Sequence, residues 1–311
     1  MIIPSSQPCN PITSGFAPNR TAVTVAAALA AEEIVCDALQ GCKAGCSRHP
    51  LRVQEHGWTE VANLTNMAMM TPDERRTPTD AAAAAPPTDA AIAGGQAVGA
   101  YRPTIGKDFI NERHRGYSVY PTRDGVAIDH PVFGWLRRGD ALKLYEMAYF
   151  SPGDILDLGT HKGLSSTVMA EAVFDAGSGA SIVTLEINEE YSGVARRAHR
   201  ERRLTNIDYR VGDAAKHLDT FVGEGRKFGF AFVDHSHRYG PTKEACIRLG
   251  KLLMPGGFVL FHDYADPRNA DPGNDEYDVV RAVRDHLPPS FRFAAMSGCC
   301  ALYEFTGDGS G

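Results

Sequence analysis

The stretch that most constrains the fold runs from residue 154 to residue 163 and reads Asp-Ile-Leu-Asp-Leu-Gly-Thr-His-Lys-Gly. Its apolar residues predict a short buried strand, and a helical pattern begins directly afterwards at Leu164. Gly159 and Gly163 allow the backbone to approach a ligand closely, and the helix start offers N–H groups to polar or anionic atoms. The segment therefore predicts a nucleotide-type ligand at the carboxyl end of a first strand, against the alternative of an ordinary strand-turn-helix. The spacing Asp-x-Gly-x-x-x-Gly differs from Gly-x-Gly-x-x-Gly and argues against a dinucleotide.

From residue 101 onward, strand and helix patterns alternate. The expected strands are 154–159, 181–186, 207–211, 229–234, 257–262, 291–295 and 299–305, and the expected helices are 163–175, 189–203, 214–223, 241–253 and 276–286. Near-continuous apolar strands indicate parallel strands that are covered on both faces. The last two strands are too close for a crossover and must form an antiparallel hairpin. We therefore predict a doubly wound, Rossmann-like α/β fold with a seven-stranded, mostly parallel sheet and an antiparallel last strand.

The first hundred residues have a different character. Residues 77–100 are of low complexity, with five consecutive alanines, two prolines and a Gly/Ala run, and cannot bury enough apolar surface to order themselves. We expect 1–100 to be a largely disordered extension and linker, 101–150 an N-terminal helical and lid segment, and 151–306 the ligand-binding domain. Within the lid segment, Trp135 either covers the ligand or packs on the core.

Composition excludes several classes of function. The net charge is −6 and no long Lys/Arg run exists, so the sequence favours no nucleic-acid partner. No apolar stretch reaches the roughly 18 residues that a spanning helix needs, so we expect no membrane partner. The chain start lacks the basic region before an apolar segment that is typical of a secretory signal.

The seven cysteines show no disulfide framework, which fits a cytoplasmic location. Four potential ligands cluster loosely but miss the usual zinc spacings: Cys36, Cys42, Cys46 and His49. Cys299 and Cys300 stand together in a strand-like run, so we expect their side chains to point to opposite faces as buried apolar groups.

Polar side chains recur where the expected strands end, which is the edge where ligands bind in such sheets. Glu186 ends the second strand and can accept both hydroxyls of a ribose. Asp213 and Ala214 follow the third strand and could face an adenine edge. Glu186 and Asp213 could each instead cap the next helix. The fourth and fifth strands end at Asp234 and Asp263.

With these motifs, residues 130–305 resemble a class I S-adenosylmethionine-dependent methyltransferase. The resemblance implies that the glycine-rich motif, Glu186, the turn at 213–214 and Asp234 bind S-adenosylmethionine. The implied donor-binding residues are Asp157, Gly159, Thr160, Gly163, Ser165, Glu186, Asp213, Ala214 and Asp234.

The segment 232–239, Phe-Val-Asp-His-Ser-His-Arg-Tyr, is similar to metal-dependent O-methyltransferases of the catechol type, and 134–145 looks like antibiotic sugar O-methyltransferases. This implies a divalent cation, usually Mg²⁺, on Asp234 and Asp263, where it lowers the pKa of a bound hydroxyl. His237 occupies the position of the general base, a role that suits a side chain with a reference pKa near 6.5. Tyr264 departs from the family pattern, so Asp266, His262 or water completes the shell, or no metal binds.

The resemblance implies transfer of a methyl group to a hydroxyl of a small-molecule acceptor, in secondary metabolism. Two alternatives remain open, an N-methyltransferase that needs no metal and a non-catalytic protein that binds S-adenosylmethionine. A nicotinamide-dependent oxidoreductase is disfavoured by the glycine spacing. A homodimer is compatible with the resemblance, because many relatives are dimers or larger.

Overall fold

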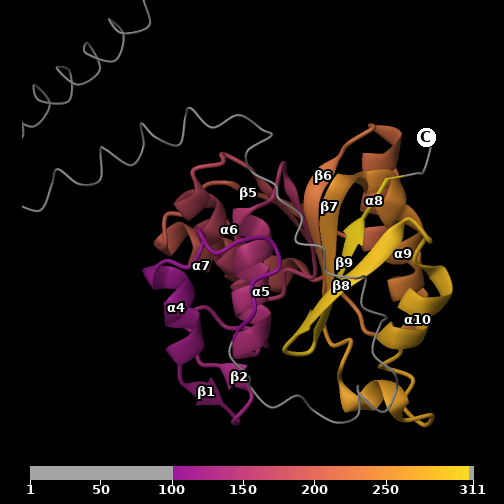
Figure 1. Cartoon of the computed structure of the whole chain (residues 1–311), viewed down its shortest axis with the longest axis horizontal. Coiled ribbons are helices and arrows are strands. Elements are labelled where there is room, and N and C mark those ends of the chain that lie inside the picture. Colours follow the sequence, from indigo (N-terminus) through magenta and orange to yellow (C-terminus); the bar gives the residue numbers. More distant parts are fainter. Residues whose placement is uncertain (1–100, 308–311) are drawn as a thin grey trace, which may run out of the picture. The chain divides into compact units, whose positions relative to one another are not determined.

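The computed structural model describes residues 101–307, and these residues form a mixed sheet with helices on both faces (Figure 1). The predictions for the extension 1–100 and for its cysteines lie outside the described residues. None of the helices in residues 101–307 is long and apolar enough to cross a membrane.

Seven strands form the sheet in the order β5-β4-β3-β6-β7-β9-β8. They are β3 (Ile155–Leu158), β4 (Ile182–Glu186), β5 (Ile207–Val211), β6 (Phe228–Val233), β7 (Leu253–Phe261), β8 (Phe291–Ser297) and β9 (Cys300–Phe305). The first five pair in parallel, and β9 lies antiparallel between β7 and β8. The predicted mostly parallel sheet with an antiparallel last strand is confirmed.

Helices cover the two faces as separate groups. They are α4 (Glu112–Val119), α5 (Arg138–Tyr149), α6 (Leu164–Ala176), α7 (Glu189–Glu201), α8 (Ala214–Gly223), α9 (Tyr239–Leu252) and α10 (Val279–His286), with a short 3₁₀ helix, η2 (Pro267–Ala270). Figure 1 shows α4 to α7 on one side of the sheet and α8 to α10 on the other. Helical crossover connections on both sides of a parallel sheet are the defining feature of a doubly wound fold.

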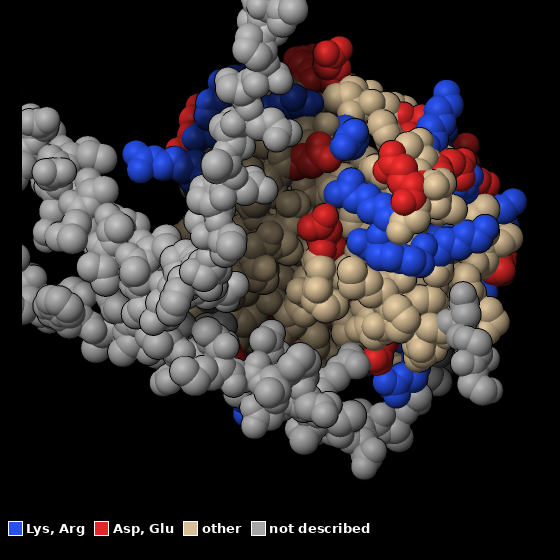
Figure 2. Space-filling view, turned by 90° about the horizontal axis from the view of Figure 1, so that it is seen from above, with Lys and Arg blue, Asp and Glu red and all other residues tan. Residues whose placement is uncertain are grey.

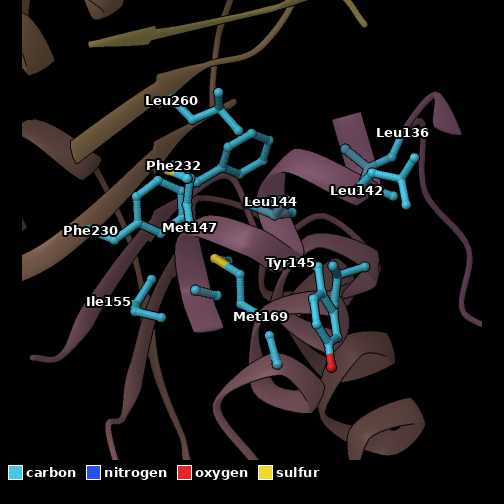
Figure 3. Close-up of a cluster of buried hydrophobic side chains, with 14 of the residues drawn as sticks. Leu136, Leu142, Leu144, Tyr145, Met147, Ile155, Met169, Phe230, Phe232 and Leu260 are labelled. Atoms are coloured by element: carbon cyan, nitrogen blue, oxygen red, sulfur yellow. The ribbon is translucent and has the colours of Figure 1, made fainter. Parts of the chain in front are cut away.

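Alternate residues of the central strands pack into two different hydrophobic clusters, because successive side chains along a strand point to opposite faces. Ile155 and Phe230 pack with Met147 of α5 and Met169 of α6 in one cluster (Figure 3). The intervening residues, such as Leu156, contribute to the second cluster under α8, α9 and α10. Both faces of the central strands are buried, which is why these strands read as continuous apolar runs.

The segment 101–150 joins the first core through α5 and also contains a two-stranded hairpin, β1 (Thr122–Arg123) with β2 (Ala127–Ile128). A buried ion pair anchors it, since Lys143 Nζ lies 2.5 Å from Glu146 Oε2 and the two side chains are 1% and 0% exposed. The alternative in which Trp135 packs on the core is wrong, because its side chain is 55% exposed. Arg123 instead stacks on it, 4.6 Å from the ring centre.

The connection between β8 and β9 corrects one prediction. The strand β9 begins at Cys300, and Gly298 (φ +58°) and Cys299 form the turn before it. Cys299 and Cys300 therefore do not alternate across a strand, and both thiols lie beside Asp140 at the start of α5, each 3.4 Å from a carboxylate oxygen.

Charged side chains of both signs lie next to one another on the face seen in Figure 2. This mixed surface accords with the small net charge of the chain.

Candidate active site

Strand register brings the predicted ligand-binding turns together at one edge of the sheet. Leu158 pairs with Val233, which in turn pairs with Phe261. The next residue of each strand, in the same order, is Gly159, Asp234 and His262. Because parallel strands end in register here, residues far apart in the sequence become neighbours at the carboxyl edge, as predicted.

A cavity of about 480 Å³ opens at this edge. It is bounded by the turns after β3, β4, β5 and β6 and includes His235 and Ser236. Four predicted donor-binding residues line it: Gly159, Glu186, Asp213 and Ala214. The volume and the mixture of apolar walls with a few polar groups suit a nucleoside-sized ligand.

Gly159 is required by the close packing of two turns. Its φ is +106°, and a Cβ atom there would lie 2.3 Å from the carbonyl oxygen of Asp234. Any side chain would push the β3 turn away from the β6 turn and deform the cavity between them.

Of the two residues that the sequence offered as helix caps, Asp213 is one and Glu186 is not, because Asn188 caps α7. Glu186 accepts hydrogen bonds from the backbone N–H groups of His161 (2.7 Å) and Asn188 (2.9 Å), which fixes the turns beside the cavity. Asp213 caps α8 by accepting from Lys216 N at 3.1 Å. Both residues also line the cavity, and each carboxylate oxygen has a second lone pair with which to bind a ligand hydroxyl.

The other predicted donor-binding residues of the glycine motif are not among the residues that line this cavity. Asp157 is fully buried and accepts hydrogen bonds from Thr184 (2.7 Å) and Ser165 (3.3 Å), and Thr160 bonds Thr184 in turn. Burial raises the pKa of Asp157 to about 8. These side chains brace the first turn from below.

Gly163 (φ +101°) begins α6, and a Cβ atom there would meet the His199 ring at 2.7 Å. A side chain at Gly163 is therefore excluded by the packing of α6 against His199 of α7, and not by the close approach of a ligand.

Asp234, His237 and Asp263 converge as the sequence predicted. His237 Nε2 lies 3.3 Å from Asp234 Oδ1 and 3.2 Å from Asp263 Oδ2, so two carboxylates face one imidazole nitrogen. Burial disfavours the charge on Asp234, yet His262 and His237 hold its pKa well below the ordinary value. Asp263 reaches this position with φ +51°, a left-handed conformation that turns the chain directly after His262.

Tyr264 does not contact this cluster. Its ring is fully buried in the second core, and its hydroxyl lies 3.2 Å from that of Tyr303. Asp266 is also engaged elsewhere, since it binds Arg268 at 2.8 Å and caps η2. Of the two side chains that the sequence offered to complete a metal shell, Asp266 and His262, the structure brings His262 to the carboxylates.

His262 is the central residue whose role the sequence did not assign. Nδ1 lies 3.0 Å from Asp234 Oδ1 and 3.4 Å from Asp263 Oδ1, and Nε2 lies 3.4 Å from Asp140 Oδ2. The pKa of the ring is raised well above its ordinary value, because Asp234, Cys299 and Asp263 outweigh the effect of burial. The place of His262 directly before Asp263 was a usable signal, whereas nothing in the sequence links it to Asp140.

Tyr277 is a second residue that sequence reasoning missed. Its ring stacks on His237 with centres 4.5 Å apart and planes only 8° from parallel, and Arg268 lies over it at 3.7 Å. The loop between β7 and α10 thus fixes the plane of the His237 ring and forms one wall beside the carboxylates.

Comparisons with known proteins agree with this geometry. Residues 156–264 match the sequence model of a family described as a methyltransferase domain. No curated protein matches the chain.

Solved structures with a similar fold include three O-methyltransferases or proteins so described. The O-methyltransferase from Bacillus cereus in complex with S-adenosylhomocysteine is 20% identical over 52% of this chain and 79% of that chain, with a TM-score of 0.46. The O-methyltransferase TomG from Streptomyces achromogenes is 21% identical over 58% and 84%, with a TM-score of 0.48. A putative O-methyltransferase from Klebsiella pneumoniae is 15% identical over 81% and 98%, with a TM-score of 0.47.

The matched segment spans the glycine turn, Glu186, Asp213, Asp234 and Asp263, which are the residues gathered at the carboxyl edge of the sheet. Residues 156–264, about a third of the chain, therefore match a methyltransferase domain, and they contain the turns that meet at this edge of the sheet.

Proposed function

We propose that the protein transfers a methyl group from S-adenosylmethionine to a hydroxyl oxygen of a small molecule. The observation that carries the proposal is the convergence of Asp234, Asp263 and His237 beside the donor cavity. His235 and Ser236 line the cavity, and the residues directly before and after them, Asp234 and His237, belong to this cluster. A donor in the cavity would present its methyl group toward an acceptor held at this cluster.

The donor set of the cluster fits a divalent cation. Asp234 and Asp263 supply hard carboxylate oxygens that approach the same nitrogen, within 3.3 and 3.2 Å, and such oxygens are the ligands that Mg²⁺ prefers. When bound, the cation lowers the pKa of a coordinated hydroxyl. Asp234 and Asp263 are the residues that would hold it, with acceptor and water oxygens in the remaining positions.

His237 is placed to take the proton of the acceptor. Nε2 faces the two carboxylates, and the stacked Tyr277 ring prevents rotation out of this plane. The chain thereby aligns the acceptor oxygen with the donor methyl group and removes its proton.

The acceptor class follows from the sequence resemblance to antibiotic sugar and catechol O-methyltransferases. We propose a hydroxylated metabolite of secondary metabolism as the substrate. The loop between β7 and α10 contributes Tyr277 and Arg268 to the wall of the site, which provides an aromatic and a cationic surface for such a molecule.

The test is formation of S-adenosylhomocysteine by the full chain with a panel of hydroxylated and amino acceptors, with Mg²⁺ or with EDTA. We expect activity only on hydroxyls, loss of activity in EDTA and in Asp263→Asn, and a drop of about 10²–10⁴-fold in kcat for His237→Gln. Asp208→Asn is the matched control, because this half-exposed carboxylate on β5 forms an ion pair with Arg210 alone among the described residues.

Two results would replace this proposal. Methylation of amines that survives EDTA and Asp263→Asn would establish the N-methyltransferase alternative. Tight binding of S-adenosylhomocysteine without turnover of any acceptor would favour a non-catalytic binding protein.

A further inference from the structure

A second group of side chains that could hold a metal ion lies around Nε2 of His262, and it touches the first group, because Cys299 Sγ lies 3.4 Å from Asp263 Oδ1. Nδ1 of His262 faces Asp234, whereas Nε2 faces Asp140 and Cys299, with Cys300 beside them. All four side chains are buried, with exposures of 0% for Asp140, 4% for His262, 1% for Cys299 and 0% for Cys300. Methyl transfer as proposed above uses neither thiol and does not use Asp140.

The distances in this group are those of a tetrahedral site. Asp140 Oδ2 lies 3.4 Å from His262 Nε2 and 3.4 Å from Cys299 Sγ, and Cys299 Sγ lies 3.5 Å from His262 Nε2. These atoms form a nearly equilateral triangle. Zinc bonds of 2.0–2.3 Å in tetrahedral geometry place neighbouring ligands about 3.3–3.8 Å apart, so the triangle matches one face of such a site.

Cys300 provides the fourth ligand, beside the other oxygen of Asp140. Its Sγ lies 3.4 Å from Asp140 Oδ1, and a ligand atom from each of the four residues lies within 4.8 Å of the others. Two thiols, one imidazole and one carboxylate form a borderline-soft donor set that suits Zn²⁺, in contrast to the carboxylate oxygens of the neighbouring cluster.

The second nitrogen of His262 supports the same assignment. A histidine that binds zinc through one nitrogen usually donates its other N–H to a carboxylate. His262 Nδ1 lies 3.0 Å from Asp234 Oδ1, close enough for such a bond, although in the metal-free chain this buried nitrogen has no hydrogen-bond partner of suitable geometry among the described residues.

We propose that Asp140, His262, Cys299 and Cys300 bind a structural zinc ion. The site fastens the β8–β9 turn to the start of α5 and fixes the His262 ring behind the carboxylates. The turn is already shaped for this purpose, because Cys299 N–H donates to Asp140 at 2.8 Å and a Cβ atom on Gly298 would collide with the same carboxylate. The proposal does not depend on the acceptor or on methyl transfer, since its test measures metal content and spectra.

The experiment measures zinc in the full chain by inductively coupled plasma mass spectrometry, after dialysis against zinc and then against buffer. The variants are Cys299→Ser and Cys300→Ser, and the matched control is Cys246→Ser, a buried thiol on α9 that lies outside the cluster. We expect one zinc ion retained by the wild type and by the control, and a loss of affinity of more than about 100-fold in each cluster variant, since even outer-shell partners cost 10–100-fold.

Cobalt titration of the metal-free wild type provides a second readout that does not rely on the folding of a variant. We expect a thiolate-to-cobalt charge-transfer band of the intensity that two thiolates give, with tetrahedral d–d bands, whereas the carboxylate cluster has one thiol beside it, since Cys299 Sγ lies 3.4 Å from Asp263 Oδ1. Three results would overturn the proposal: no charge-transfer band in the wild type, zinc and band fully retained in both cluster variants, or a Cys299–Cys300 disulfide in the reduced-buffer preparation.

Discussion

Replacement of Gly159 by alanine tests the idea that the β3 and β6 turns are packed backbone against backbone. The nearest atoms to the new Cβ would be Asp234 O at 2.3 Å, Asp234 C at 2.6 Å and His235 Cα at 2.8 Å. All three are backbone atoms, so no side-chain rotation can relieve the overlap. The left-handed φ of +106° adds conformational strain.

The magnitude follows from two contributions. A non-glycine residue at positive φ costs about 1–2 kcal/mol, and overpacking costs about 1–3 kcal/mol more. We therefore expect Gly159→Ala to lower the free energy of unfolding by about 2–5 kcal/mol, the sum of these terms. It should also weaken binding of S-adenosylhomocysteine, because the displaced turn lines the cavity.

Gly177→Ala is the matched control. Gly177 also has a positive φ, of +61°, at the end of α6, but a Cβ atom added there would have no neighbour within 4 Å. It should cost only the conformational part, about 1–2 kcal/mol, and leave ligand affinity unchanged. Urea unfolding and calorimetric titration measure both quantities. Equal destabilisation by the two substitutions, or unaltered affinity in Gly159→Ala, would refute the packing argument.

Two further predictions concern buried charge. Lys143→Met leaves the Glu146 carboxylate buried without its cation and should lower the free energy of unfolding in urea by about 3–5 kcal/mol. The double variant Lys143→Met with Glu146→Gln should recover much of this loss of stability. If it recovers none, the buried charge is not the cause. Burial raises the pKa of Asp157 to about 8 in the folded chain, whereas an unfolded aspartate has a pKa of about 3.9. The protonated carboxyl therefore contributes its full stability below pH 4, and this contribution is lost as the pH rises toward 8. The stability of Asp157→Asn relative to wild type should therefore increase between pH 5 and pH 8, and parallel pH profiles of the two proteins would contradict the raised pKa.

The sequence predicted the sheet because its local signals agree with one another. Apolar runs such as Phe228–Val233 are buried on both faces, and helical patterns of matching length separate them, so strand order and direction follow from the rules of crossover connections. The same rules placed Glu186, Asp213, Asp234 and Asp263 at one edge from the order of the elements alone. Those expectations required only that parallel strands share a carboxyl edge.

The orientations of individual side chains were decided by tertiary structure. Asp157 and Gly163 belong to the predicted ligand motif, yet burial against Thr184 and His199 turns them away from the cavity. Tyr264 follows Asp263 in the sequence, but the positive φ of Asp263 directs the Tyr264 ring into the second core.

The meeting of Asp140 with Cys299 is the clearest case, because the two residues are 159 positions apart. The sequence by itself determined the fold, the donor edge and the acidic pair, since periodicity and strand ends are local properties. Only the packing of the β8–β9 turn on α5 brought a carboxylate and two thiols to the far edge of His262, because such contacts depend on how complete elements pack in three dimensions.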